Sequence, residues 1–390
     1  MSYFDSAATT PIHPDVLEAM MPYLKDDYGN AGSIHKKGRR AMSAISNARE
    51  QVASLIGCNA EQIIFTSGGS EANNIAIAGL KNYLLSTQKT HIIASRIEHD
   101  SVLRTIESLC KSNGGSPFEM SLLEVQRNGC VTISDFINTI KGRTGLVSVM
   151  HTNNEIGSIN PVSDIGEICK LNGILFHTDC VQAIGTEKIN VDDIGCDLMS
   201  ISGHKINAPK GIGALFVRDM KLLNPIIYGG MSQEFGYRGG TENVPAIVGM
   251  GVACDLLRKN MESDTKYISG LKAEFEKALI EYSERLCIKD KFHINSPPDS
   301  RKIVNIRFDG VDGQTLLLML DGDGVYVSAG SACRSLESHP SHVLTAIGLS
   351  ESDARSSIRI SLSKLNTEDE VRDAALNIMT NASILINGVK

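Results

Sequence analysis

One lysine, Lys205, lies in a short polar stretch between two apolar runs of the sequence. It follows Ser202 and His204, and the apolar runs at 197–202 and 212–217 are predicted to be buried strands. Burial disfavours the charged form of a lysine, so a lysine in this place is costly unless it is paired or takes part in chemistry. Considered by itself, the stretch also suits a surface lysine in a turn.

A glycine turn after another predicted strand could bind an anion. The strand at 63–66 is followed by Gly69 and Ser70, and a helix is predicted to begin near Ser70. Free N–H groups at the start of a helix bind phosphate. The turn lacks the Gly-Lys-Ser/Thr ending of a Walker A loop, and an ordinary glycine turn with a serine cap remains the alternative.

Asp179 and His99 also follow predicted strands. Asp179 comes directly after the strand at 174–178, and a carboxylate that is half-buried there needs a cation or strong donors. A protonated pyridine nitrogen would serve, and a helix-capping aspartate is the alternative. Gln182 lies one helical turn further on, within reach of a ring oxygen. His99 follows the strand at 91–95, where a structural histidine is the alternative.

Together these features match one cofactor, pyridoxal 5'-phosphate (PLP), bound as a Schiff base to Lys205. The glycine turn would hold the phosphate. Asp179 would hold the proton on the pyridine nitrogen and so make the ring an electron sink. The flat ring of His99 completes the arrangement.

The elements that must position these residues alternate along the chain. Short apolar runs are separated by stretches long enough for crossover helices. This alternation predicts an α/β fold with a mostly parallel sheet flanked by helices. Ligands bind at the carboxyl ends of the strands in such sheets, and the residues above all follow strand ends. The predicted strands of this sheet are 63–66, 91–95, 145–150, 174–178, 197–202 and 212–217.

The pattern changes near residue 256. A long polar helix is predicted over 244–283, followed by strands at 303–308 and 325–328. We therefore predict a large PLP-binding domain over 13–256. A smaller α+β domain, formed by 1–12 and 257–390, would carry Cys333.

The composition limits the classes of function. The chain has 390 residues, a net charge of −7 and no long basic run, which argues against direct nucleic-acid binding. None of the nine cysteines forms a C-x-x-C pair, so we expect no structural metal site and a reduced, cytoplasmic compartment. No signal peptide and no membrane span are expected.

Seven stretches resemble a known family over essentially the whole chain. The sequence is similar to the NifS/IscS-type cysteine desulfurases, within the class V aminotransferase group of fold type I PLP enzymes. The stretches that carry the resemblance are 5–10, 66–74, 151–157, 202–205, 238–243, 328–333 and 356–361.

The resemblance implies roles around the cofactor. Lys205 would be the Schiff-base lysine, Asp179 the partner of the pyridinium nitrogen and Gln182 the contact to the ring oxygen. His99 would stack on the ring and assist proton transfer. The phosphate would be held by residues from both subunits of a homodimer: Gly69, Ser70, Ser202, His204 and, from the other subunit, Thr241.

The resemblance also implies the substrate and the reaction. Asn154 and Arg359 would bind the carboxylate of L-cysteine, since a guanidinium matches a carboxylate through two parallel bonds. Cys333 would be the catalytic nucleophile that separates a desulfurase from its aminotransferase relatives, because a thiolate attacks sulfur. L-cysteine would become L-alanine, with a persulfide formed on Cys333.

Two matters stay open in the sequence. The activity could instead be that of a selenocysteine lyase or a class V aminotransferase. The protein that accepts the sulfur could be an iron–sulfur scaffold or a partner in tRNA or DNA sulfur modification.

Overall fold

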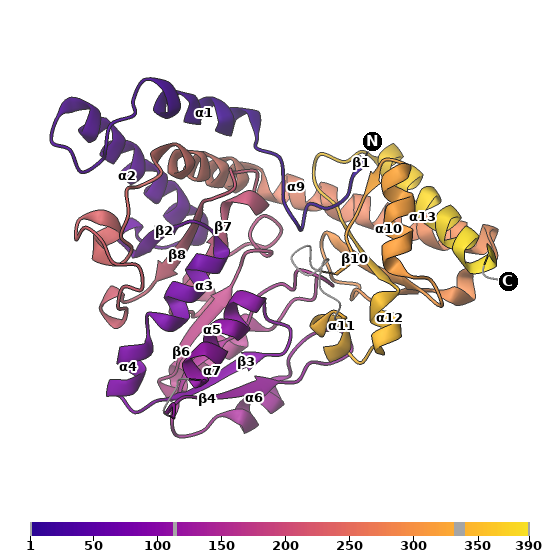
Figure 1. Ribbon diagram of the computed structural model, residues 1–390, viewed down its shortest axis with the longest axis horizontal. Coiled ribbons are helices and arrows are strands. Elements are labelled where there is room, and N and C mark those ends of the chain that lie inside the picture. The colour runs from indigo at the N-terminus through magenta and orange to yellow at the C-terminus, as the bar shows by residue number, and fades with distance from the viewer. Residues whose placement is uncertain (1, 112–114, 331–339, 389–390) are drawn as a thin grey trace.

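Two bodies are joined by one long helix, α9 (Val244–Arg285) (Figure 1). This computed structural model describes residues 2–111, 115–330 and 340–388. The larger body contains a seven-stranded sheet, and the smaller body, at the right of Figure 1, contains a three-stranded sheet. No helix within the described ranges is long and apolar enough to cross a membrane.

The large sheet has the strand order β2-β8-β7-β6-β5-β3-β4. Only β8 runs antiparallel to its neighbours β2 and β7, so the sheet is mostly parallel, as predicted. Most of these strands are buried along their whole length, which is typical of a sheet covered on both faces. The strands are β2 (Ile63–Thr66), β3 (His91–Ser95), β4 (Glu119–Leu123), β5 (Thr144–Ser148), β6 (Leu175–Asp179), β7 (Leu198–Ser202) and β8 (Gly213–Val217).

Local sequence signals begin and end the helices of the larger body. α1 begins at Pro14, whose ring suits a first helical turn. α2 ends at Gly57, which has a φ of 73° in the left-handed region that favours glycine. The helices are α1 (Pro14–Lys25), α2 (Lys36–Ile56), α3 (Gly69–Ala78), α4 (Lys81–Ser86), α5 (Asp100–Cys110), α6 (Ile133–Thr139), α7 (Val162–Asn172) and α8 (Val191–Ile194).

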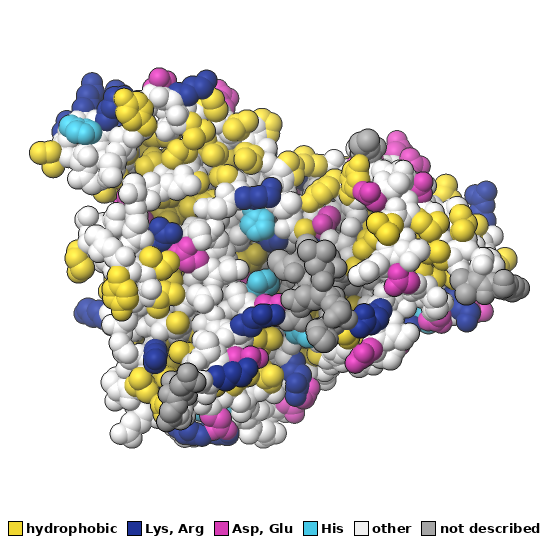
Figure 2. Space-filling model, viewed as in Figure 1, with side chains coloured by type: hydrophobic (Ala, Val, Ile, Leu, Met, Phe, Trp, Pro, Cys, Tyr) yellow, Lys and Arg dark blue, Asp and Glu magenta, His cyan; other side chains and the backbone are white. Residues whose placement is uncertain are grey.

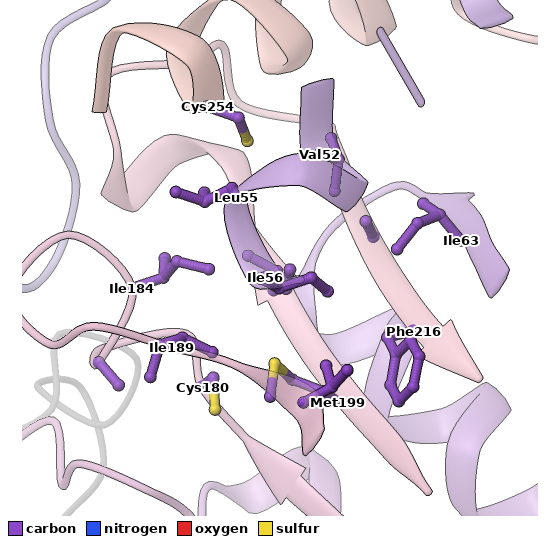
Figure 3. Packing of buried hydrophobic residues seen from close by; sticks show 14 of the residues in the cluster. Val52, Leu55, Ile56, Ile63, Cys180, Ile184, Ile189, Met199, Phe216 and Cys254 are labelled. Atoms are coloured by element: carbon purple, nitrogen blue, oxygen red, sulfur yellow. The ribbon is translucent and has the colours of Figure 1, made fainter. Parts of the chain in front are cut away.

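The largest hydrophobic core lies between the large sheet and the pair of helices α2 and α9. Figure 3 shows Val52 and Ile56 of α2 and Cys254 of α9 above Met199 and Phe216 of the sheet. All five side chains are buried. This packing holds one face of the sheet rigid, and with it the strand ends.

The smaller body has its own sheet and its own core. Its antiparallel strands are β9 (Phe292–Ile294), β10 (Ile303–Phe308) and β12 (Ser357–Ser361), with β10 in the centre. The N-terminal strand β1 (Ser2–Tyr3) pairs with β11 (Val325–Tyr326) beside this core. Its helices are α10 (Gly313–Gly322), α11 (His342–Ala346), α12 (Glu351–Arg355) and α13 (Glu368–Gly388).

Two strands differ from the sequence-based expectations, and the domain boundary is untested. Strand β4 was not predicted, because its residues lie half-buried beside β3 and show no alternation. The strand predicted over 325–328 is wrong in its second half, since Ser328 forms only an isolated bridge to Arg359. The domain boundary at residue 256 remains a prediction, because α9 passes through it without a break.

Candidate active site

A cavity of about 190 Å³ lies at the carboxyl ends of β3, β5, β6 and β7, where the sequence places the candidate residues. The smaller body closes it with Arg359 from β12. The structure brings most of the predicted site residues together here. Those that line the cavity are Gly69, Ser70, His99, Asn154, Asp179, Gln182, Ser202, His204, Lys205 and Arg359.

One end of the cavity suits an anion. Helix α3 begins at Gly69, and the preceding Gly68 supplies no side-chain cap, so free backbone N–H groups remain. A Cβ on Gly69 would lie 2.8 Å from Cγ2 of Val181, so only glycine lets the helix start approach this closely. The hydroxyl of Ser202 is buried and has no hydrogen-bond partner among the described residues. A phosphate would satisfy both groups of donors.

His204 beside this end is held neutral. Burial first, and then the charges of Lys205 and Lys210, lower the pKa of His204 to about 4. Its Nδ1 lies 3.3 Å from the hydroxyl of Thr9. A neutral imidazole can contact a phosphate without adding a second positive charge next to Lys205.

Asp179, the last residue of β6, is held by two donors. Its Oδ1 accepts from the backbone N–H of Val181 at 2.9 Å, and its Oδ2 accepts from Nδ2 of Asn73 at 2.8 Å. The carboxyl is only 5% exposed. A buried carboxyl group fixed by two donors suits a protonated ring nitrogen as a further partner.

Asn73 links Asp179 to His99. Nδ2 of Asn73 also donates to the hydroxyl of Ser101 at 2.9 Å. This hydroxyl in turn lies 2.7 Å from Nδ1 of His99. The backbone N–H of Ser101 also donates to that Nδ1, so this ring nitrogen is an acceptor. Asn73 and Ser101 were not among the predicted site residues, although Asn73 lies within one of the motifs.

Lys205 bonds to the N-terminal arm of the chain, the residues that precede α1. It ends the 3₁₀ turn η2 (Gly203–Lys205), and its Nζ donates to the carbonyls of Ala7 and Ala8, both at 2.6 Å. Nε2 of Gln182 also donates to Ala7, at 2.8 Å, whereas Oε1 of Gln182 is buried with no partner in the described chain. The arm therefore forms a wall of the cavity that the sequence did not predict.

Arg359, in the middle of β12, is 1% exposed. Its guanidinium donates to the carbonyl of Asn154 at 2.8 Å and to Oδ1 of Asp5 at 2.8 Å. The Nε–H is buried and has no partner among the described residues. A buried guanidinium with a free N–H beside Asn154 suits the carboxylate of a small substrate.

One predicted site residue does not line this cavity, and another is not among the described residues. Thr241 lines a separate hollow together with Arg238 and Asn243. Cys333 lies outside the described residues. Their roles remain predictions.

The eight cysteines in the described ranges do not line the cavity. Burial raises the pKa of most of their thiols, to about 12 for Cys58, Cys169 and Cys254. Such thiols remain protonated at neutral pH and are poor nucleophiles. Cys287 is exposed, but it lies beyond the end of α9.

Comparison with known proteins assigns the family. A family model described as aminotransferase class-V matches residues 2–373. The chain belongs to this family. A relative named cysteine desulfurase IscS, from Dictyoglomus turgidum, is 43% identical over 95% of this chain and 91% of its own length.

Solved structures of the family have the same fold. A structure titled NifS-like protein matches with a TM-score of 0.88 and 33% identity, over 97% of this chain and 98% of that one. A structure titled SspA in complex with cysteine matches with a TM-score of 0.81 and 38% identity, over 94% of this chain and 100% of that one. The predicted family and fold class are thus confirmed, and the family is one of PLP enzymes.

Glu98, next to His99, is a fully buried carboxyl that the sequence analysis missed. Its Oε1 accepts from the hydroxyl of Ser95 at 2.5 Å and from the backbone N–H of Met150 at 2.8 Å. Its Oε2 has no partner within the described chain. Burial raises the pKa of Glu98 to about 8, so the carboxyl is largely protonated at neutral pH.

The pKa of Glu98 predicts a pH dependence of stability. The folded protein retains this proton up to about pH 8, whereas an unfolded glutamate loses it near pH 4.3. The folded state therefore binds more protons between these values, and stability falls as the pH rises through this range. The side chain of Glu98→Gln cannot ionise. The melting temperature of this variant, relative to that of the wild type, should therefore rise between pH 5 and pH 8.5.

The exposed Glu61 provides the matched control for this measurement. Glu61→Gln should follow the wild-type melting curve at every pH. A constant difference in melting temperature between Glu98→Gln and the wild type would show that Glu98 does not titrate in this range.

Proposed function

We propose that this protein is a PLP-dependent cysteine desulfurase. It converts L-cysteine to L-alanine and takes up the sulfur as a persulfide on Cys333. One observation carries the proposal: a single cavity combines Lys205, Asp179 and the start of α3 on one side with Arg359 on the other. The relatives that are named cysteine desulfurases support it.

The residues present fit PLP. The N–H groups at the start of α3 suit the phosphate, as does the hydroxyl of Ser202, which has no partner within the described part of the chain; His204 lines the same cavity. Asp179 suits the ring nitrogen, and Gln182 the ring oxygen. Lys205 would be the covalent attachment point of PLP, and the bound cofactor would supply an electron sink that weakens the bonds at Cα and Cβ of an amino acid.

The side chains of this protein then have separate tasks. Arg359 and Asn154 hold the substrate carboxylate. Lys205 moves a proton from Cα towards Cβ, assisted by His99. The thiolate of Cys333 attacks the substrate sulfur, so that an S–S bond forms while the Cβ–S bond breaks. Cβ takes up the proton that left Cα, and Cα takes up a proton that balances the one released by the Cys333 thiol. The products are L-alanine and one persulfide.

A homodimer is part of the proposal. Large apolar side chains are exposed over α1, α2 and the loop between them, at the upper left of Figure 2. Tyr228 and Met231 are also exposed, at 82% and 84%, on the segment that leads to Thr241. Exposed apolar patches favour association with another protein. A second copy would bring Thr241 to the phosphate of its partner.

The persulfide must be passed to an acceptor protein. An iron–sulfur scaffold and a tRNA- or DNA-modifying partner both suit this chemistry. A reduced cytoplasmic compartment agrees with a thiol nucleophile. The net charge of −7 favours contact with any nucleic acid through a partner rather than directly.

The proposal is tested by giving the holoenzyme L-cysteine without any keto acid. Alanine is quantified, and the protein is alkylated and mapped by mass spectrometry. We expect one extra sulfur on the peptide that contains Cys333 and one alanine for each persulfide. A requirement for a keto acid would indicate an aminotransferase, and activity confined to L-selenocysteine would indicate a selenocysteine lyase.

Arg359→Lys should raise the KM for L-cysteine with a smaller effect on kcat. A lysine has one point charge and cannot form two parallel bonds to a carboxylate. Losing one charge-assisted hydrogen bond costs about 1.5 to 3 kcal/mol, which corresponds to a KM about 10- to 100-fold higher. Steady-state kinetics of alanine formation measure this.

Arg307→Lys is the matched control for Arg359→Lys. Arg307 lies in the neighbouring strand β10 and pairs with Asp309 and Asp353, away from the cavity. The KM of Arg307→Lys for L-cysteine should equal that of the wild type. An unchanged KM in Arg359→Lys would remove Arg359 from the carboxylate site.

A further inference from the structure

The carboxylate of Glu155 lies close to the described chain on both sides of the segment that carries Cys333. Its Oε2 accepts from the hydroxyl of Ser341 at 2.5 Å. The same oxygen lies 3.2 Å from the position of a Cβ on Gly330, so Gly330 approaches it closely. Gly330 is the last described residue before Cys333. After Cys333 the described chain resumes at Pro340, and Ser341 follows it.

Glu155 is buried in a rigid turn, and its exposed fraction is 1%. Oδ1 of Asn153 accepts from the backbone N–H groups of Glu155 and Ile156, at 2.8 and 3.0 Å. Nδ2 of Asn305 donates to the carbonyl of Glu155 at 3.3 Å. The turn therefore has little freedom to move with the groups that its carboxylate holds.

The same turn belongs to the substrate site. Asn154 precedes Glu155, and its carbonyl accepts from the guanidinium of Arg359 at 2.8 Å. The backbone of Arg359 in turn pairs with Ser328, two residues before Gly330. The residues proposed to bind the substrate carboxylate thus hold the N-terminal end of the Cys333 segment directly.

The C-terminal end is tied to the loop that carries His99. Nε2 of His342 donates to the carbonyl of Glu98 at 3.0 Å. Ser341 is also the N-cap of α11, since its Oγ accepts from the backbone N–H of Leu344 at 3.2 Å while it donates to Glu155. The single hydroxyl of Ser341 therefore makes two hydrogen bonds, one of which is the contact with Glu155.

We infer that Glu155 is a positioning residue for sulfur transfer. It fixes Ser341 through a hydrogen bond and lies close to Gly330, beside the Asn154–Arg359 pair, and so directs the segment between them towards a substrate bound through its carboxylate. This inference rests on the proposed function. It predicts an effect on the rate of persulfide formation and none on the binding of L-cysteine, because Glu155 does not line the cavity.

The test compares four variants of the holoenzyme in single-turnover experiments. Glu155→Gln removes the charge, Ser341→Ala removes the hydroxyl, and the double variant removes both. Ser350→Ala is the matched control, because Ser350 caps the adjacent helix α12 through Asp353 and does not contact Glu155. Persulfide on Cys333 is followed by alkylation, and L-cysteine binding by the change in cofactor absorbance.

We expect persulfide formation about 10-fold slower in Glu155→Gln and Ser341→Ala, the loss that corresponds to one hydrogen bond to a charged group. The concentration of L-cysteine that gives half of the absorbance change should stay within about twofold of the wild-type value. This is much less than the expected tenfold change in rate. The double variant should be no slower than the slower single variant, because both changes break one contact. Ser350→Ala should match the wild type.

The inference fails if Glu155→Gln and Ser341→Ala form persulfide at the wild-type rate. It also fails if their effects multiply, or if L-cysteine binding weakens as much as the rate falls. A wild-type protein that forms no persulfide on Cys333 would remove the proposed function and this inference with it. A wild-type persulfide with unchanged variants would remove the inference alone.

Discussion

Replacing Lys205 with alanine is expected to lower the rate of alanine formation from L-cysteine by about 10³-fold or more, because the proposed general acid–base group and the covalent attachment of the cofactor are both lost. Lys205 lines the same cavity as Asp179 and Gly69, the first residue of α3. Steady-state assays with saturating PLP measure the loss. The absorbance of bound PLP reports separately whether the cofactor remains.

Lys205 also holds the N-terminal arm through the carbonyls of Ala7 and Ala8, so the test needs a variant that loosens only the arm. Thr10→Val is suitable, because Thr10 Oγ1 bonds the arm to the carbonyl of His204 and to the backbone N–H of Asn207. Thr10→Val should retain most of the activity. An equal loss in both variants would mean that Lys205 acts through the arm, not through chemistry.

Replacing Cys333 with alanine should abolish persulfide formation and reduce alanine formation to about 1% of the wild-type rate or less, in line with the loss of an attacking nucleophile. PLP absorbance and the melting temperature should stay unchanged, since every residue proposed to hold the phosphate and the ring is retained in this variant. Labelled L-cysteine, alkylation and mass spectrometry measure the sulfur on the protein.

Cys287→Ala is the matched control for the Cys333 variant, because Cys287 is exposed and lies beyond α9. It should form the persulfide at the wild-type rate. Undiminished alanine and sulfide release from Cys333→Ala would show that another group accepts the sulfur, and the desulfurase mechanism proposed above would be wrong.

The sequence by itself determined the fold class and most of the residues of the cavity. Asp179, Ser202 and His99 each end or follow an apolar run, and the carboxyl ends of parallel strands meet at one edge of a sheet. Periodicity and turn residues are local signals, so they placed these residues at that edge without any knowledge of distant contacts.

Only the tertiary structure decided what holds these residues in place. Gln182 and Lys205 bond to Ala7, which is 175 and 198 positions away, and Arg359 bonds to Asp5, 354 positions away. Asn73, Glu98 and Glu155 gain their partners in the same way, from other elements. Local sequence patterns carry no information about such pairs, because the packing of the whole chain brings them together.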